Sequence, residues 1–152
     1  MKELLANFPL VASLSGMLLA QFLKIPYYYI IDKKLNWKHL FESGGMPSSH
    51  SAMSGALAVA IGITQGWESG AFAISVAFAS IVMYDAVGVR RATGKQSLLL
   101  NRILEESYKT GRMNIEKLHE YTGHTPFEVL GGLILGILVA LALNYGGYHI
   151  VS

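Results

Sequence analysis

The 152-residue sequence contains no cysteine and few charged residues. Without cysteine the chain has neither disulfide bonds nor thiolate metal ligands. Lys, Arg, Asp and Glu make up 14% of the residues, against roughly 25% in soluble domains. Hydrophobic residues make up 52%. These proportions exclude an ordinary soluble domain and indicate an integral membrane protein, and the length fits a single domain covering residues 1–152.

Charged side chains are absent from three long segments, residues 4–23, 69–84 and 129–148, and from a shorter one at 51–67. Crossing a bilayer takes about 20 apolar residues, so two of these segments suffice and a third does if Asp85 is included. We therefore predict an all-α membrane bundle of about four transmembrane helices, near residues 5–25, 48–66, 69–90 and 126–148. The start, Met1-Lys2-Glu3, has no net positive charge and no convincing cleavage site follows, which favours a retained helix over a signal peptide.

The basic residues lie almost entirely in two connections. Eleven of the 12 Lys and Arg side chains follow the first or the third predicted helix, and only Lys2 does not. The positive-inside rule predicts that both connections are cytoplasmic in a multi-pass protein of the plasma membrane. The second connection also predicts one or two short cytoplasmic helices, an amphipathic one near residues 97–108 and another from Asn114 to Gly123.

The segment GGMPSSHSA, residues 44–52, lies where a polar stretch enters a hydrophobic helix. Backbone N–H groups and the positive end of the helix dipole make such a helix start suitable for binding phosphate. Ser48 or Ser49 can cap the helix, and either can contact the anion. His50 could then donate a proton to the bound group. The alternative is that His50 sits at the membrane interface and titrates without a function.

A second histidine, His124, precedes the last hydrophobic segment and lies four residues before Glu128. This spacing places both side chains on one helical face, where Glu128 can orient the imidazole as a nucleophile. The same residues also form a capping box, with Thr125 at the N-cap, Pro126 at N1 and Glu128 at N3. Both interpretations stay open at the level of local sequence.

Charged residues at the ends of the other two helices complete the candidate site. Asp85, within an apolar run, either pairs simply with Arg90 or Arg91 or orients an arginine that holds phosphate. Lys24 is either a membrane anchor or a further phosphate ligand. The predicted topology brings both histidines and Lys24, Arg90 and Arg91 to one membrane depth. A metal site is an alternative, because His50, His124, Glu128 and Asp85 are all acceptable ligand types.

Three motifs together resemble a known family. PSSH at residues 47–50 is similar to the Pro-Ser-Gly-His motif of type 2 phosphatidic acid phosphatases and vanadium haloperoxidases, and His124-x-x-x-Glu128 is similar to the end of their third motif. With DAVGVRR at residues 85–91, the set resembles the divergent PAP2 family over nearly the full chain. The resemblance implies a metal-free, cofactor-independent lipid-phosphate phosphatase of the cytoplasmic face. In it, His124 forms a phosphohistidine, Glu128 orients it and His50 protonates the leaving oxygen.

The sequence also departs from the better-known relatives. In their first motif a Lys is followed seven residues later by Arg-Pro, but here that position after Lys24 is Ile31. In their third motif an Arg precedes the histidine by six residues, where this chain has Leu118. We assign the role of these missing clamps to Arg90 and Arg91 by hypothesis.

The expected partners are a phosphorylated lipid, with phosphatidylglycerophosphate as one candidate, and the surrounding membrane lipids, but no nucleic acid. Four helices are fewer than the six usual in the family, which points to a homodimer or a heavily remodelled core. The alternative function is a non-enzymatic transport or anionic-lipid-binding protein that uses the same basic and histidine cluster.

Overall fold

A computed structural model describes residues 2–33, 45–109 and 123–148. All regular structure in these ranges is helical, with no strand, which confirms the predicted all-α class. The helices are α1 (Lys2–Ala6), α2 (Phe8–Asp32), α3 (Ser49–Gln65), α4 (Gly70–Val87), α5 (Val89–Lys109) and α6 (Pro126–Tyr145).

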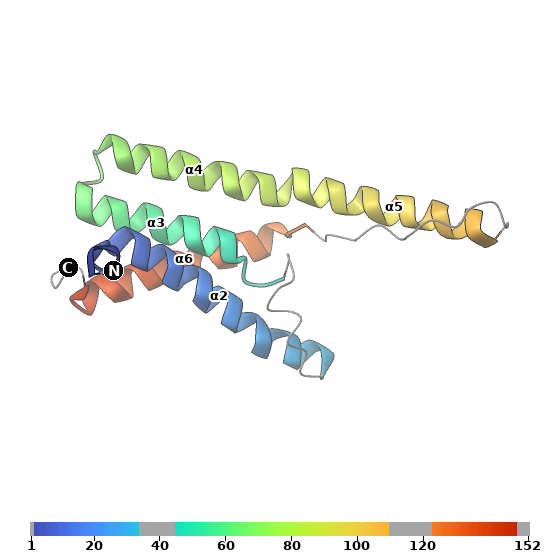
Figure 1. The fold of residues 1–152 in the computed structure, drawn as a ribbon, viewed down its shortest axis with the longest axis horizontal. Helices are drawn as coiled ribbons and strands as arrows, with labels where there is room; N and C mark the ends of the chain where they lie inside the picture. The colour runs from blue at the N-terminus through green and yellow to red at the C-terminus, as the bar shows by residue number, and fades with distance from the viewer. Residues whose placement is uncertain (1, 34–44, 110–122, 149–152) are drawn as a thin grey trace.

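Helix α3 occupies the centre of the bundle, in contact with α2, α4 and α6 (Figure 1). With 17 residues it is shorter than the helices around it that could span a bilayer. Among the described residues three segments are long and apolar enough to do so, Phe8–Ile30, Gly70–Glu105 and Pro126–Tyr145. The predicted helix at 48–66 is present as α3. It is enclosed by the other helices and is not among the three candidate spans.

Small residues allow α6 to lie directly against α3. A Cβ atom added to Gly132 would collide with the backbone carbonyl oxygen of Ser48, and one added to Gly136 would collide with that of Ala52. Both glycines are buried. The Gly132-x-x-x-Gly136 pair is thus a packing motif, because only glycine permits this approach of helix to backbone.

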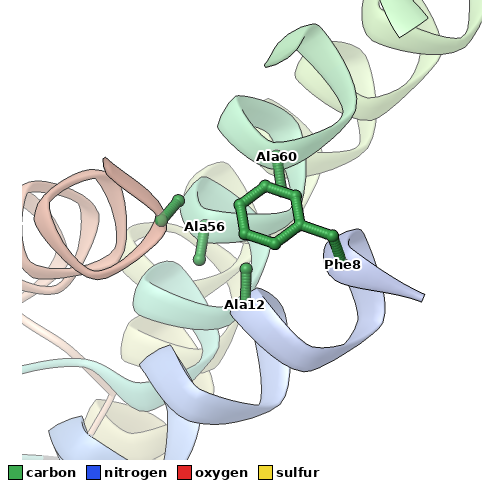
Figure 2. Close-up of a cluster of buried hydrophobic side chains, with 5 residues drawn as sticks. Phe8, Ala12, Ala56 and Ala60 are labelled. Atoms are coloured by element: carbon green, nitrogen blue, oxygen red, sulfur yellow. The ribbon is translucent and has the colours of Figure 1, made fainter. Parts of the chain in front are cut away.

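The end of the bundle that holds both described termini has an apolar core of small side chains around one aromatic ring. Phe8 is buried against Ala12 of α2 and against Ala56 and Ala60 of α3 (Figure 2). On the C-terminal side, the Tyr148 hydroxyl donates a hydrogen bond to the Leu5 carbonyl at 2.6 Å. Because the start of α2 packs against the second half of α3, the two helices are antiparallel. Helix α2 therefore runs toward the N-terminus of α3 as it approaches Lys24.

Two helix boundaries differ from those predicted. Helix α2 continues to Asp32 through Pro26, although a helix ending near residue 25 was expected from the sequence. The predicted third helix at 69–90 ends at Val87, and α5 begins already at Val89, well before the expected amphipathic segment at 97–108. In Figure 1, α5 continues nearly along the line of α4 and projects past the other helices. The helix predicted from Asn114 lies outside the described residues.

Candidate functional site

A backbone hydrogen bond joins the two histidine motifs. The Ser48 N–H donates to the Glu128 carbonyl over 3.0 Å, and this bond links the loop before α3 to the first turn of α6. The close approach at Gly132, one turn further along α6, fixes the same contact. Two segments separated by about eighty residues in the sequence are therefore held together at the helix starts that carry His50 and His124.

Ser48 is the N-cap of α3, one of the two caps that the sequence allowed. Its Oγ accepts a 3.4 Å hydrogen bond from the Ser51 N–H and a 3.0 Å bond from the Ser51 hydroxyl. The Ser48 side chain is fully buried and Ser49 is also buried. Both serines lie at the predicted helix start, and the Ser48 hydroxyl serves to close that start.

The loop before Ser48 is held by α2. Gly45 has a φ of +83°, a conformation that favours glycine. A Cβ atom there would also overlap the hydroxyl of Tyr28. Tyr28 lies one helical turn beyond Lys24 on the same face of α2. Helix α2 therefore also contacts the loop before Ser48, through Tyr28.

His124 is the buried imidazole of the site. The residue is 5% exposed, and its Nε2 atom is buried without a hydrogen-bond partner among the described residues. Burial lowers the pKa of His124, the carboxylate of Glu128 raises it, and the charges of Lys24, His50 and Arg90 lower it further. The net direction is downward, so the ring is neutral over a wider pH range than an ordinary histidine.

His50, in the first turn of α3 and outside the three candidate spans, is exposed. Partial desolvation of its ring lowers the pKa of His50, and the charges of Arg90 and Lys24 lower it further. Lys24 and Arg90 thus act on both imidazoles. Lys24 itself is 1% exposed, so it does not extend to the surface as a membrane anchor would. Of the three cations expected at the depth of the two histidines, Lys24 and Arg90 lie near enough for their charges to shift the pKa of both imidazoles.

Glu128 forms the complete capping box of α6. Its carboxylate accepts a hydrogen bond from the Thr125 N–H at 3.1 Å, and the Thr125 hydroxyl accepts one from the Glu128 N–H at 3.3 Å. Within the described residues no hydrogen bond joins Glu128 to His124. Glu128 therefore caps the helix and acts on His124 through its charge.

Replacing Glu128 with Gln separates these two roles. Gln also completes a capping box, so we expect the midpoint of thermal unfolding to stay close to that of the parent protein. Because the carboxylate raises the pKa of His124, its removal should lower that pKa further, as followed by NMR titration of the ring. Thr125→Ala is the matched control, which removes the other half of the box and should cost about 1 kcal/mol of stability. An unchanged His124 pKa in Glu128→Gln would contradict the electrostatic role.

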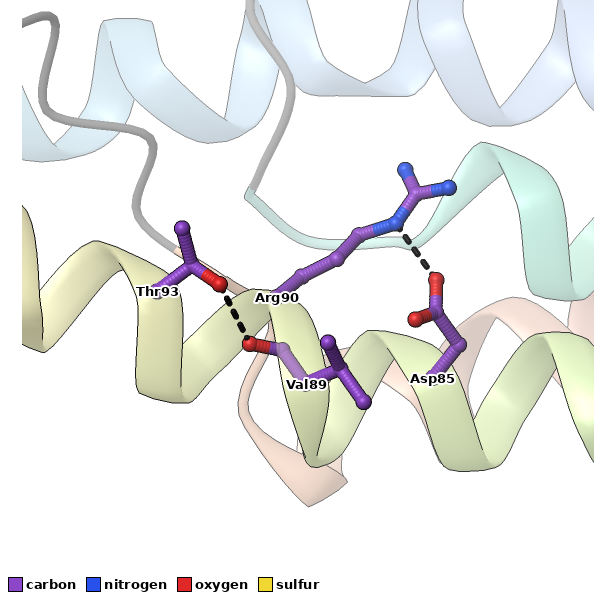
Figure 3. A network of polar contacts seen from close by, with 4 residues as sticks. All are labelled: Asp85, Val89, Arg90 and Thr93. Atoms are coloured by element: carbon purple, nitrogen blue, oxygen red, sulfur yellow. Dashed lines mark hydrogen bonds and ion pairs between the residues drawn. The ribbon is translucent and has the colours of Figure 1, made fainter.

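Asp85 pairs with Arg90 across the junction of α4 and α5. The Arg90 Nε donates to the Asp85 Oδ2 at 2.6 Å, and both side chains are partly exposed rather than buried. Figure 3 shows that the two terminal nitrogens of the guanidinium point away from the carboxylate. Asp85 thus fixes the arginine and leaves its planar fork available for an anion.

Arg91 is placed differently from Arg90. Arg90 and Lys24, rather than Arg91, are the cations that shift the pKa of both imidazoles, and the Arg91 side chain makes no ion pair within the part of the chain that the structure describes. Its backbone instead packs against Gly123, where an added Cβ atom would overlap the N and Cα atoms of Arg91. Gly123 was not among the predicted site residues. The available signal was a glycine immediately before His124, which by itself does not show what the glycine packs against.

The alternative of a metal site finds no ligand set in the described residues. No group of three or more His, Asp or Glu side chains there comes close enough to hold a metal ion. The carboxylates of Asp85 and Glu128 are engaged with Arg90 and with the Thr125 N–H.

The fold and the site define an all-helical membrane protein in which two histidine-bearing helix starts meet. The chain belongs to the divergent PAP2 family, whose model matches residues 5–139. It is also similar to the uncharacterized membrane protein YuiD of Bacillus subtilis strain 168, at 40% identity over 94% of this chain and 98% of that protein. No solved structure gives a significant match.

Proposed function

We propose that the protein is a metal-independent phosphatase of phosphorylated membrane lipids, acting at the cytoplasmic face. The observation that carries this proposal is the hydrogen bond from the Ser48 N–H to the Glu128 carbonyl. It joins the two motifs whose histidines must act on one phosphoryl group. Without that contact, His50 and His124 would be separate helix starts with no shared substrate.

In the proposed reaction the neutral His124 is the nucleophile. Its unpartnered Nε2 attacks phosphorus, a nitrogen–phosphorus bond forms, and the bond from phosphorus to the lipid oxygen breaks. Protonated His50 donates its proton to the leaving oxygen, which departs as an alcohol. A water molecule then attacks the phosphohistidine and loses a proton to His50, which releases inorganic phosphate and restores both imidazoles.

The lowered pKa values suit the nucleophile better than the acid. A low pKa keeps His124 unprotonated and able to attack. His50 must instead carry a proton, and its pKa is lowered by partial desolvation of the ring and further by the charges of Arg90 and Lys24. A bound phosphate offsets these two charges and so weakens their part of the shift. Substrate binding therefore favours the protonated form of His50 when it is needed.

Lys24 and Arg90 are the cations we propose to hold the phosphoryl oxygens. Lys24 is buried and its charge acts on both imidazoles, and Arg90 is fixed by Asp85 with its terminal nitrogens turned away from the carboxylate. Lys24 matches the lysine of the first motif, and Arg90 takes the role of a missing motif arginine in this proposal. Arg91 is assigned a weaker part, because it is not among the cations that shift the pKa of the imidazoles.

The placement of the site favours a lipid substrate and a cytoplasmic site. His50 lies at the start of α3, which packs against the candidate spans, and His124 lies at the start of the span α6, near exposed apolar side chains such as Phe127 and Leu130. The basic connections begin on the same side, which the positive-inside rule assigns to the cytoplasm.

One assay tests both the activity and its orientation. Sealed membrane vesicles containing the overproduced protein are given short-chain phosphatidylglycerophosphate, phosphatidic acid or a polyprenyl pyrophosphate that cannot cross the bilayer. Inside-out vesicles should release phosphate from at least one of these lipids, and right-side-out vesicles should do so only after detergent is added. Binding without phosphate release in either orientation would favour the anionic-lipid-binding alternative. Release by intact right-side-out vesicles alone would reverse the orientation.

A further inference from the structure

Helix α5 exposes apolar side chains at a place where the bilayer core no longer covers them. Helix α4 has 18 residues and is therefore about 27 Å long, close to the thickness of a bilayer core, about 30 Å. Helix α5 thus begins at the membrane surface. It continues nearly along the line of α4 in Figure 1, and in this direction Leu99 and Ile103 lie roughly 16 and 22 Å beyond Gly88. Both side chains are half exposed or more.

The exposed apolar side chains of α5 lie on one face of the helix. They recur at intervals of three, four and seven residues, which places them above one another in a helix. Gly94 and Asn101 lie on the opposite side and are buried, so α5 packs through that side and leaves the apolar face uncovered. This face, called here the α5 strip, consists of Val89, Ala92, Leu99, Leu100 and Ile103.

Positive charge borders the α5 strip. Residues 89–104 contain four basic side chains and no acidic one. Lys95 and Arg102 are both exposed and, being seven residues apart, lie on one side of the helix, about 100° round from the strip. A helix with an apolar face beside Lys and Arg has the pattern of one that lies in the membrane interface. The charges fit the cytoplasmic leaflet, whose anionic lipids attract basic segments next to a membrane span.

We propose that α5 is a membrane-surface helix that binds the anionic lipids of the cytoplasmic leaflet, with the α5 strip against the acyl chains and Lys95 and Arg102 against lipid phosphates. The junction with α4 permits this position. The two helices meet at Gly88, whose ψ of −89° departs from the α-helical value of about −42°. Because glycine has no side chain, the chain can bend there while α4 remains in the bilayer.

This surface role goes beyond the proposed phosphatase function and does not depend on it. Helix α5 would bind the leaflet equally in a protein without enzymatic activity. Its first turn carries Arg90, which is paired with Asp85 and acts on both imidazoles. A membrane-bound α5 therefore gathers anionic lipids beside the two histidine motifs.

The lack of cysteine makes the position of α5 measurable with single labels. Ile103→Cys and Glu105→Cys place a nitroxide spin label on opposite sides of α5, two residues apart. Each full-length variant is reconstituted into vesicles of equal parts phosphatidylcholine and phosphatidylglycerol. Collisions with a water-soluble nickel chelate should be at least about fivefold less frequent at position 103 than at 105, and collisions with oxygen more frequent. Equal access of the chelate to both labels would overturn the proposal.

The same spectra test the main competing occupant, a second copy of the chain. Dipolar broadening of the label at position 103 that disappears when unlabelled protein is mixed in would assign the α5 strip to an interface between copies. That result would contradict a membrane-bound α5. Both measurements leave phosphate release aside, so failure of the proposed phosphatase function would not affect them.

Charge variants test the part played by anionic lipids. In the Ile103→Cys background, Lys95→Gln with Arg102→Gln should lower the ratio of surface-bound to free α5 about fivefold for each cation removed. Vesicles of phosphatidylcholine alone should have a similar effect on the parent protein. Lys33→Gln is the control, because this exposed lysine at the end of α2 lies outside α5. An unchanged label position in the double variant would contradict binding through anionic lipids.

Discussion

His124→Ala is expected to abolish phosphate release from every substrate, whereas His50→Ala is expected to abolish it only from lipids. The reason lies in the leaving group. A lipid alkoxide must be protonated as it departs, so loss of the acid should cost about 10³-fold in kcat. An activated aryl phosphate, such as para-nitrophenyl phosphate, leaves without a proton and should be hydrolysed by His50→Ala nearly as well as by the parent protein. No leaving group compensates for a missing nucleophile.

The two variants control for each other. Both remove one imidazole from the same cluster, and the His124 ring has no partner at Nε2 whose loss would disrupt packing. Thermal unfolding in detergent checks that both variants are folded, because truncation of the buried His124 ring leaves a cavity. Equal losses of lipid and aryl phosphate hydrolysis in His50→Ala would contradict its role as the acid. Lipid phosphate hydrolysis by His124→Ala would exclude it as the nucleophile.

Gly132→Ala is expected to be severely damaging, although alanine is the better helix former. The added methyl group would meet the Ser48 carbonyl oxygen, which cannot move without opening the contact of α6 with α3. We expect a loss of about 1–3 kcal/mol in the free energy of unfolding and loss of phosphate release. Thermal unfolding in detergent and the lipid assay measure the two effects.

The neighbouring glycine provides the control. At Gly131 an added Cβ meets the terminal methyl group of Met46 at 3.2 Å, and this flexible side chain can move aside. Gly131→Ala should therefore keep its activity and unfold at or above the parent temperature, because alanine has the higher helix propensity. Similar behaviour of both variants would show that the contact between Ser48 and α6 does not hold the site together.

Local sequence patterns predicted the two helix starts of the site correctly. Ser48 caps α3, and Thr125, Pro126 and Glu128 occupy the N-cap, N1 and N3 positions of α6. These interactions involve residues three or fewer positions apart, so the sequence contains all the information they need. The sequence could not decide whether Glu128 caps or orients. The structure shows the cap and an electrostatic effect on His124.

Features that depend on tertiary contact were not predictable. Gly88 interrupts a continuous hydrophobic run, and the sequence around it does not show that Gly123 packs beside the break. The burial of Lys24 likewise follows from the antiparallel packing of α2 on α3, whereas the sequence allowed a surface anchor equally well. Helix α3 corresponds to the predicted helix at 48–66, and with 17 residues it is not among the three candidate spans.

Trapping the phosphorylated protein tests most directly whether His124 is the nucleophile. Purified protein is mixed with a lipid phosphate labelled in the phosphoryl group, quenched in alkali within a single turnover, and analysed by peptide mass spectrometry. We expect a phosphoryl group on His124 that is stable in alkali and lost in acid, and no labelled protein in His124→Ala. Phosphate release without any phosphorylated histidine, or with the label on another residue, would contradict this role of His124.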